Sequence, residues 1–197
     1  ELLQAAPQVK LLVTCRERLN VQGEAVFVLG GLPVSDGEAL ISGGAAQLFL
    51  QHARLVRSTL AVQESDRAII NHICHLVEGM PLALVLAASW VDMLSFAEIA
   101  EEVTRSLDFL ETDMADVPLR QRSIRAIFDA SWRRLTEEEQ AVFCQLSVFR
   151  GGFTRPAAQA VAAATLRSLR TLVHKLFVTL DERGRYQIHE LLRQYGG

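Results

Sequence analysis

Lysine is almost absent from this sequence of 197 residues, in which Lys10 and Lys175 are the only two and arginine supplies the other basic side chains. The formal net charge of -3 gives no general attraction to nucleic acid or to an anionic membrane, although a local basic patch stays open. The sequence also lacks an apolar run near the roughly 20 residues of a membrane span, and it lacks the basic start of a signal peptide. We therefore expect a cytoplasmic protein without a membrane partner.

Cysteine is scarce as well, and the three residues Cys15, Cys74 and Cys144 lie far apart in apolar surroundings. This spacing indicates buried free thiols in a reducing compartment rather than a disulfide framework. His72 and His75 share a helical face, but Cys74 points elsewhere and no acidic partner is evident, so we expect no metal site. Half of the residues are hydrophobic, which is enough for a sizeable core.

The sequence has no Gly-X4-Gly-Lys-Ser/Thr phosphate loop and no apolar strand that ends in paired acidic residues. The pair Gly151-Gly152 has no lysine after it, and we interpret it as a packing turn. We therefore expect no catalytic residue in this chain and no nucleotide hydrolysis by the chain alone. Because it begins at Glu1 without methionine, we expect it to be part of a longer protein.

Two short apolar runs open the chain. Val9–Thr14 and Ala25–Leu29 are rich in β-branched residues and too continuous to alternate, which is typical of strands buried in a parallel sheet. Two strands alone would be unstable, so we interpret residues 1–34 as the C-terminal edge of an α/β domain. Arg16 would follow the first strand at its carboxyl end, where an arginine is well placed to bind phosphate, although most surface arginines are simply solvated.

Helical periodicity begins at Ser35 and predicts a four-helix bundle over residues 35–112. Capping-box patterns mark Ser35 and Ser95 as helix starts. The expected core consists of Phe49, Ile69, Ile73 and the apolar run 82–91. The expected helices are 36–56, 65–78, 81–93 and 95–104.

The segment Gly79-Met80-Pro81 leads directly into the most apolar helix of the chain. Proline suits the first turn of a helix because the amide hydrogen that it lacks would have no partner there. The corner can be an ordinary helix-turn-helix connection. It can also be a binding feature, since free amides at a helix N-terminus attract anions and a rigid proline edge can pack on a flat ring.

Residues 113–197 have the element order of a winged-helix domain, in which helices precede a small β-hairpin. The hairpin is expected from strands 177–180 and 185–188. His189 follows it at a strand-to-helix corner, where an imidazole can donate a hydrogen bond to a phosphate oxygen. The expected helices are 119–135, 137–146, 154–163 and 166–176.

Three segments, in this order, resemble motifs of the NB-ARC module of bacterial STAND proteins, the signal-transduction ATPases with numerous domains. Residues 11–19 resemble its sensor strand, residues 79–84 its Gly-X-Pro motif and residues 184–193 its Met-His-Asp-like motif. The resemblance implies that Arg16 senses the terminal phosphate, that Pro81 packs near adenine and that His189 contacts the ADP β-phosphate. The sequence departs from the family pattern at Cys15, Ile188 and Glu190, which stand where serine, methionine and aspartate are usual.

The resemblance also implies a fold and a set of partners. The fold would be mainly α with small β elements, made of the last strands of an α/β P-loop domain (1–34), the four-helix bundle (35–112) and a winged-helix domain (113–197). The full-length protein would bind ADP or ATP with Mg²⁺, exchange them as a slow ATPase or switch, and form a homo-oligomer when activated. An upstream P-loop domain and downstream sensor repeats, such as tetratricopeptide arrays, would be its partners, and no cofactor is expected for the chain alone.

Two other interpretations stay open. In the first, the chain is a DNA-binding winged-helix regulator with helix 166–176 in the major groove, which the acidic balance disfavours. In the second, it is a protein-interaction scaffold without nucleotide control. The basic residues that favour the first are Arg167, Arg170 and His174 on one helical face, with Arg183 and Arg185 on the wing.

Overall fold

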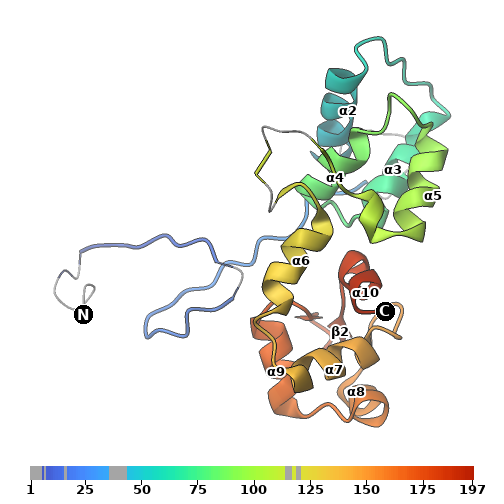
Figure 1. The fold of residues 1–197 in the computed structure, drawn as a ribbon. Helices are drawn as coiled ribbons and strands as arrows, with labels where there is room; N and C mark the ends of the chain where they lie inside the picture. The colour runs from blue at the N-terminus through green and yellow to red at the C-terminus, as the bar shows by residue number, and fades with distance from the viewer. Residues whose placement is uncertain (1–5, 7, 16, 36–43, 114–116, 119–120) are drawn as a thin grey trace.

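The computed structural model describes residues 6, 8–15, 17–35, 44–113, 117–118 and 121–197, and these residues are mainly helical with one small sheet. The prediction of a mainly α fold with small β elements is therefore confirmed (Figure 1). The elements are α2 (Gly44–Val56), α3 (Asp66–Leu76), α4 (Pro81–Ala88), α5 (Phe96–Arg105), the short 3-10 helix η1 (Leu107–Phe109), α6 (Ile124–Trp132), α7 (Glu137–Leu146), α8 (Arg155–Ala162), α9 (Leu166–His174), β1 (Thr179–Leu180), β2 (Tyr186–Gln187) and α10 (Glu190–Gly196).

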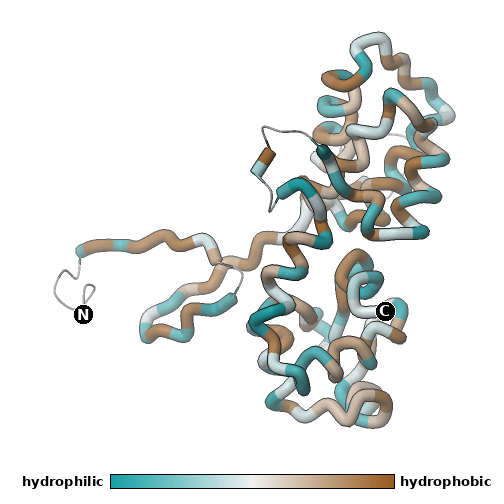
Figure 2. The backbone as a smooth tube through the Cα atoms, viewed as in Figure 1, coloured by the Kyte–Doolittle hydropathy of each residue, from teal (hydrophilic) through white to brown (hydrophobic). Residues whose placement is uncertain are grey.

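The first part of the chain is a long arm that leaves the helical body (Figure 1). The two predicted strands are wrong for the residues described, because neither 9–14 nor 25–29 forms a strand. Their apolar side chains face solvent, with Leu12 98% and Phe27 85% exposed. The backbone tube of Figure 2 is coloured as hydrophobic along stretches of the arm. A strand needs a neighbour to accept and donate its backbone hydrogen bonds, and the described part of the chain provides none here.

Helices α2 to α5 pack around one apolar cluster, with α2 against α4 and α3 against α5 (Figure 1). Phe49 and Ile73 are fully buried, as predicted, whereas Ile69 is only partly buried against the cluster. The Ser95 capping box forms as predicted, but the Ser35 box would include residues outside those described. Helix α4 ends at Ala88, earlier than predicted, where the Ser89 hydroxyl donates to the Leu86 carbonyl oxygen and competes with helical bonding.

Helices α7, α8 and α9 and the hairpin enclose a second apolar cluster. The hairpin is antiparallel, and Phe153 adds a bridge to Tyr186, so three short β segments lie side by side. Gly152 lies beside this bridge, where a Cβ atom would come within 2.8 Å of the Tyr186 carbonyl oxygen. Gly152 therefore packs closely, as the interpretation of Gly151-Gly152 as a packing turn requires, whereas a Cβ atom at Gly151 would meet nothing within 4 Å.

Helix α10 contributes residues to both clusters. Leu191 is buried in the first cluster, and Leu192 packs against both. Helix α6 also contributes to both, since Phe128 belongs to the first cluster and Trp132 packs against the second. The predicted domain limits at 34 and 112 stay predictions.

Burial distinguishes the three cysteines. Cys74 is fully buried, and burial raises the pKa of its thiol to about 12, which keeps it protonated and unreactive. Cys15 and Cys144 are exposed, so the expectation of buried thiols is wrong for these two. Among the described residues, no helix is long and apolar enough to cross a membrane, and no group of three or more His, Cys, Asp or Glu residues is placed to hold a metal ion.

Candidate functional site

The Gly-X-Pro segment forms a tight corner between α3 and α4. Gly79 has a φ of +66°, and a Cβ atom there would come within 2.1 Å of the Leu32 carbonyl oxygen. The Leu32 N–H in turn donates to the Gly79 carbonyl oxygen at 2.8 Å. Only glycine satisfies both the left-handed backbone and this close approach. The corner therefore fastens the end of the N-terminal arm to the helical body.

Pro81 occupies the first turn of α4, as predicted, and its ring is exposed. An exposed proline edge is free to pack against a ring, which is the role that the sequence suggested. Arg16 lies outside the described residues. The carboxylate of its neighbour Glu17 pairs with the Arg134 guanidinium at 2.9 Å. Arg134 lies just beyond the end of α6, whereas Pro81 is in α4 and His189 is at the start of α10.

His189 is the N-cap residue of α10 and faces Glu78, two residues beyond the end of α3. Its Nδ1 atom accepts the Leu191 N–H at 3.2 Å, which places the ring proton of the neutral form on Nε2. The Nε2 atom lies 3.7 Å from a carboxylate oxygen of Glu78, and the imidazole also has the Val77 backbone as a hydrogen-bond partner. The structure thus brings His189 to the residues immediately before the Gly79–Pro81 corner.

The surroundings of His189 favour the neutral imidazole. Burial lowers its pKa more than the carboxylates of Glu78 and Glu190 and the Val77 hydrogen bond raise it. Because the folded pKa lies below the ordinary value, the unfolded chain holds the proton more tightly. The contribution of His189 to the free energy of unfolding is therefore fully present above the ordinary pKa of histidine. It is lost as the pH falls from that pKa towards the lower pKa of the folded state.

Sequence reasoning missed Glu78, which is the residue that links the two parts of this site. One carboxylate oxygen accepts the Glu190 N–H at 2.7 Å, and the other faces His189. The only sequence signal would have been an acidic residue directly before Gly-X-Pro. That signal does not reveal a partner 112 positions away.

A second surface carries the basic residues of the predicted recognition helix. Arg167 and Arg170 are exposed on α9, and His174 is partly exposed at its end. The turn of the β1–β2 hairpin is ordered by Asp181, which accepts the N–H groups of Arg183 and Arg185. These hydrogen bonds hold the pKa of the Asp181 carboxyl below its usual value. The Arg185 guanidinium donates to the Gly152 carbonyl oxygen and so also supports the turn.

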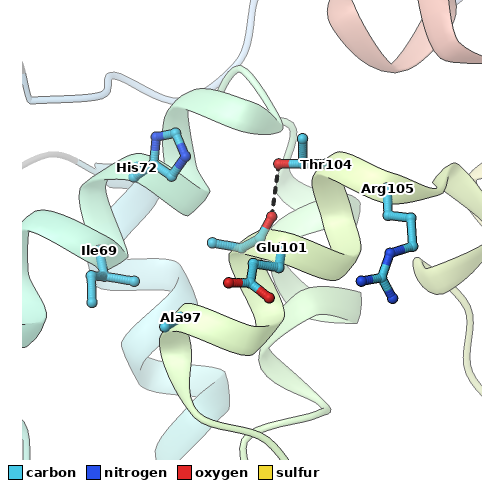
Figure 3. A pocket seen from close by; sticks show the side chains of 7 residues that line it. Ile69, His72, Ala97, Glu101, Thr104 and Arg105 are labelled. Atoms are coloured by element: carbon cyan, nitrogen blue, oxygen red, sulfur yellow. Dashed lines mark hydrogen bonds between the residues drawn. The ribbon is translucent and has the colours of Figure 1, made fainter.

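A shallow hollow of about 500 Å³ lies between α3 and α5 (Figure 3). Ile69, Ala97 and Ala100 give it apolar walls, and His72 and Glu101 also line it. Neither Pro81 nor His189 lines it. The hollow is therefore separate from the site at the Gly-X-Pro corner.

Comparison with protein-family models gives no match. The chain is similar to "Putative HTH-type transcriptional regulator Rv0890c" of Mycobacterium tuberculosis H37Rv, with 33% identity over 205 residues that cover 99% of this chain and 22% of the relative. It is also similar to "Uncharacterized protein Rv0894" of the same strain, with 30% identity over 205 residues that cover 98% of this chain and 50% of the relative. The chain thus spans about a fifth of the first relative's length and half of the second's. The designation as a regulator belongs to the first relative, which is a much longer protein.

Proposed function

We propose that this chain is the regulatory part of a transcriptional regulator, built as a nucleotide-dependent switch of the NB-ARC type. In the resting state it closes over ADP, and exchange for ATP opens it for signalling, oligomerisation or transcriptional output. The observation that carries this proposal is the meeting of the start of α10 with the Gly79–Pro81 corner, through Glu78 and His189. Two motifs that lie far apart in the sequence thus converge on one corner of the structure.

Each proposed contact uses chemistry that the residue can supply. The Nε2–H of His189, which in this structure faces Glu78 and the Val77 backbone, can donate instead to a β-phosphate oxygen, and the exposed ring of Pro81 can pack on adenine. Arg16 would bind the terminal phosphate with its planar guanidinium. The phosphate loop and the Mg²⁺ ligands would come from a P-loop domain elsewhere in the polypeptide, so we propose that the 197-residue chain binds nucleotide weakly and hydrolyses none.

The test is to measure the nucleotide that full-length protein releases on denaturation, by chromatography and mass spectrometry. We expect one equivalent of ADP in the wild type and a large loss in His189→Ala. The matched control is His72→Ala, an exposed histidine on α3, which should keep its ADP. A wild-type protein that carries no nucleotide, or a His189→Ala variant that retains it, would contradict the proposal.

DNA binding through α9 is the second candidate function, and the name of the longer relative supports it more directly than it supports a nucleotide switch. The specific structural observation in its favour is the exposed pair Arg167 and Arg170 on the predicted recognition helix. Fluorescence anisotropy with duplex DNA at increasing salt tests it. If α9 binds DNA, affinity must fall steeply with salt, and Arg167→Gln must lower both the affinity and the salt dependence. Binding that is absent at low salt would exclude this function for the chain.

A further inference from the structure

Glu78, just beyond the end of α3, contacts the start of α10 with both of its carboxylate oxygens. One accepts the Glu190 N–H at 2.7 Å, and the other lies 3.7 Å from the Nε2 atom of His189. The side chain of His189 is 21% exposed and that of Glu78 is 47% exposed. The carboxylate therefore faces solvent on one side and the imidazole on the other.

The backbone of Glu78 is unusual for its residue type. Its φ is +48°, in the left-handed region that glycine and asparagine adopt more easily than glutamate does. Gly79, with a φ of +66°, follows directly. The backbone preference of glutamate does not favour this conformation. Glutamate at this position therefore indicates a role for its side chain.

Besides Glu78, the carboxylate of Glu190 also lies near His189. Glu190 faces it from α10, but both carboxylate oxygens of Glu190 bind the Arg193 guanidinium one helical turn further on. Arg150 acts on Glu190 only as a nearby positive charge. Glu78 is thus the carboxylate that approaches His189 from the end of α3, whereas the carboxylate of Glu190 binds Arg193 within α10.

We propose that Glu78 is a positioning residue for His189, a carboxylate latch that ties the start of α10 to the end of α3 and holds the imidazole towards the Gly-X-Pro corner. The role of His189 towards a phosphate rests on the proposed function. The latch itself does not, since its contacts lie wholly within the described chain. Release of the latch would free His189 and the start of α10 together.

Nuclear magnetic resonance of the 197-residue chain with labelled histidine tests the latch. Glu78→Gln removes the charge and keeps the side-chain shape, so the pKa of His189 should fall below its wild-type value, with the Nε2–H form retained. Glu78→Gly removes the carboxylate at a backbone position that suits glycine, so hydrogen exchange of the Glu190 amide should become about tenfold faster. Glu64→Gln, an exposed acid before α3 that pairs with Arg67, is the control and should change neither quantity.

An unchanged pKa of His189 in Glu78→Gln, together with unchanged exchange of the Glu190 amide in Glu78→Gly, would overturn the latch. Because glycine relieves the backbone strain, faster exchange in that variant cannot be attributed to a weakened fold. The measurement needs no nucleotide and is therefore independent of the proposed switch. If the latch is present and full-length protein carries no ADP, the proposed switch fails and the positioning role of Glu78 stands.

Discussion

At the scale of single residues, the backbone contact between Gly79 and Leu32 leaves room for glycine alone at position 79. The left-handed φ and the missing side chain are both required, because the neighbouring carbonyl oxygen occupies the place of a Cβ atom. Gly31 makes the reciprocal approach, since its Cβ would come within 2.0 Å of the Glu78 carbonyl oxygen. The backbone of Gly31-Leu32 in the arm thus packs directly against the backbone of Glu78-Gly79 in the corner.

We predict that Gly79→Ala lowers the free energy of unfolding by about 2 to 4 kcal/mol, which combines the left-handed strain with the steric overlap. The matched control is Gly184→Ala. Gly184 has a φ of +74° but nothing within 4 Å of its Cβ position, so only the strain of about 1 kcal/mol applies. Urea denaturation of both variants measures the difference, and equal losses would show that the contact with Leu32 contributes nothing.

At the scale of elements, the caps explain why helices begin where the sequence indicates. Thr136 and Glu139 form a reciprocal capping box at the start of α7, and the same Glu139 carboxylate binds the Lys175 ammonium at 2.9 Å. Burial raises the pKa of Glu139, but the hydrogen bonds from Lys175 and Thr136 outweigh this effect and lower it. One carboxylate therefore caps α7 and attaches it to the end of α9.

We predict that Glu139→Gln destabilises the chain by about 1 to 2 kcal/mol at pH 7, because glutamine retains the capping geometry but loses the charge that pairs with Lys175. The folded pKa of Glu139 is lowered, so its contribution is present above the unfolded pKa and is lost as the pH falls through the folded value. Denaturation curves of wild type and variant should therefore converge at acidic pH. The exposed neighbour Glu138→Gln is the control, with a change of about 0.5 kcal/mol or less. A gap that persists at acidic pH would contradict the assignment.

At the scale of the whole molecule, two apolar clusters are joined by α6 and α10, and Tyr195 contacts Phe128 of the first cluster and Trp132, which packs against the second. Its ring packs edge-on against Phe128 and Trp132, and its hydroxyl donates to the Asp129 carboxylate at 2.6 Å. The Arg125 guanidinium lies 5.5 Å from the ring centroid. Burial and the Asp129 hydrogen bond raise the pKa of the phenol, so Tyr195 remains a neutral donor.

We predict that Tyr195→Ala, which removes the ring between the clusters, costs about 3 kcal/mol and separates a single thermal transition into two. Tyr195→Phe keeps the ring contacts and loses only the hydrogen bond, so it should cost about 1 kcal/mol and retain one transition. Differential scanning calorimetry distinguishes these outcomes. One sharp transition in Tyr195→Ala would mean that the clusters are coupled through other contacts.

The elements that could be predicted from the sequence are those whose signals are local. Helical periodicity, the capping box at Ser95 and the proline of α4 all act within a few residues, and the Ser95 cap and the proline lie where the pattern indicates. Of the paired glycines before Phe153, Gly152 packs closely against Tyr186, as a packing turn requires, and Gly151 does not. The strands at 9–14 and 25–29 were wrong because a strand depends on a neighbour that local sequence does not provide.

The sequence by itself determined the order of helices, the hairpin and the presence of a histidine at the start of α10, since backbone propensity and capping are encoded within one or two turns. Only the tertiary structure decided that His189 and Glu190 meet Glu78, that Leu192 contacts both clusters and that the arm ends against Gly79. These contacts join residues separated by tens of positions. Their partners are selected by how whole helices pack, which no short stretch of sequence specifies.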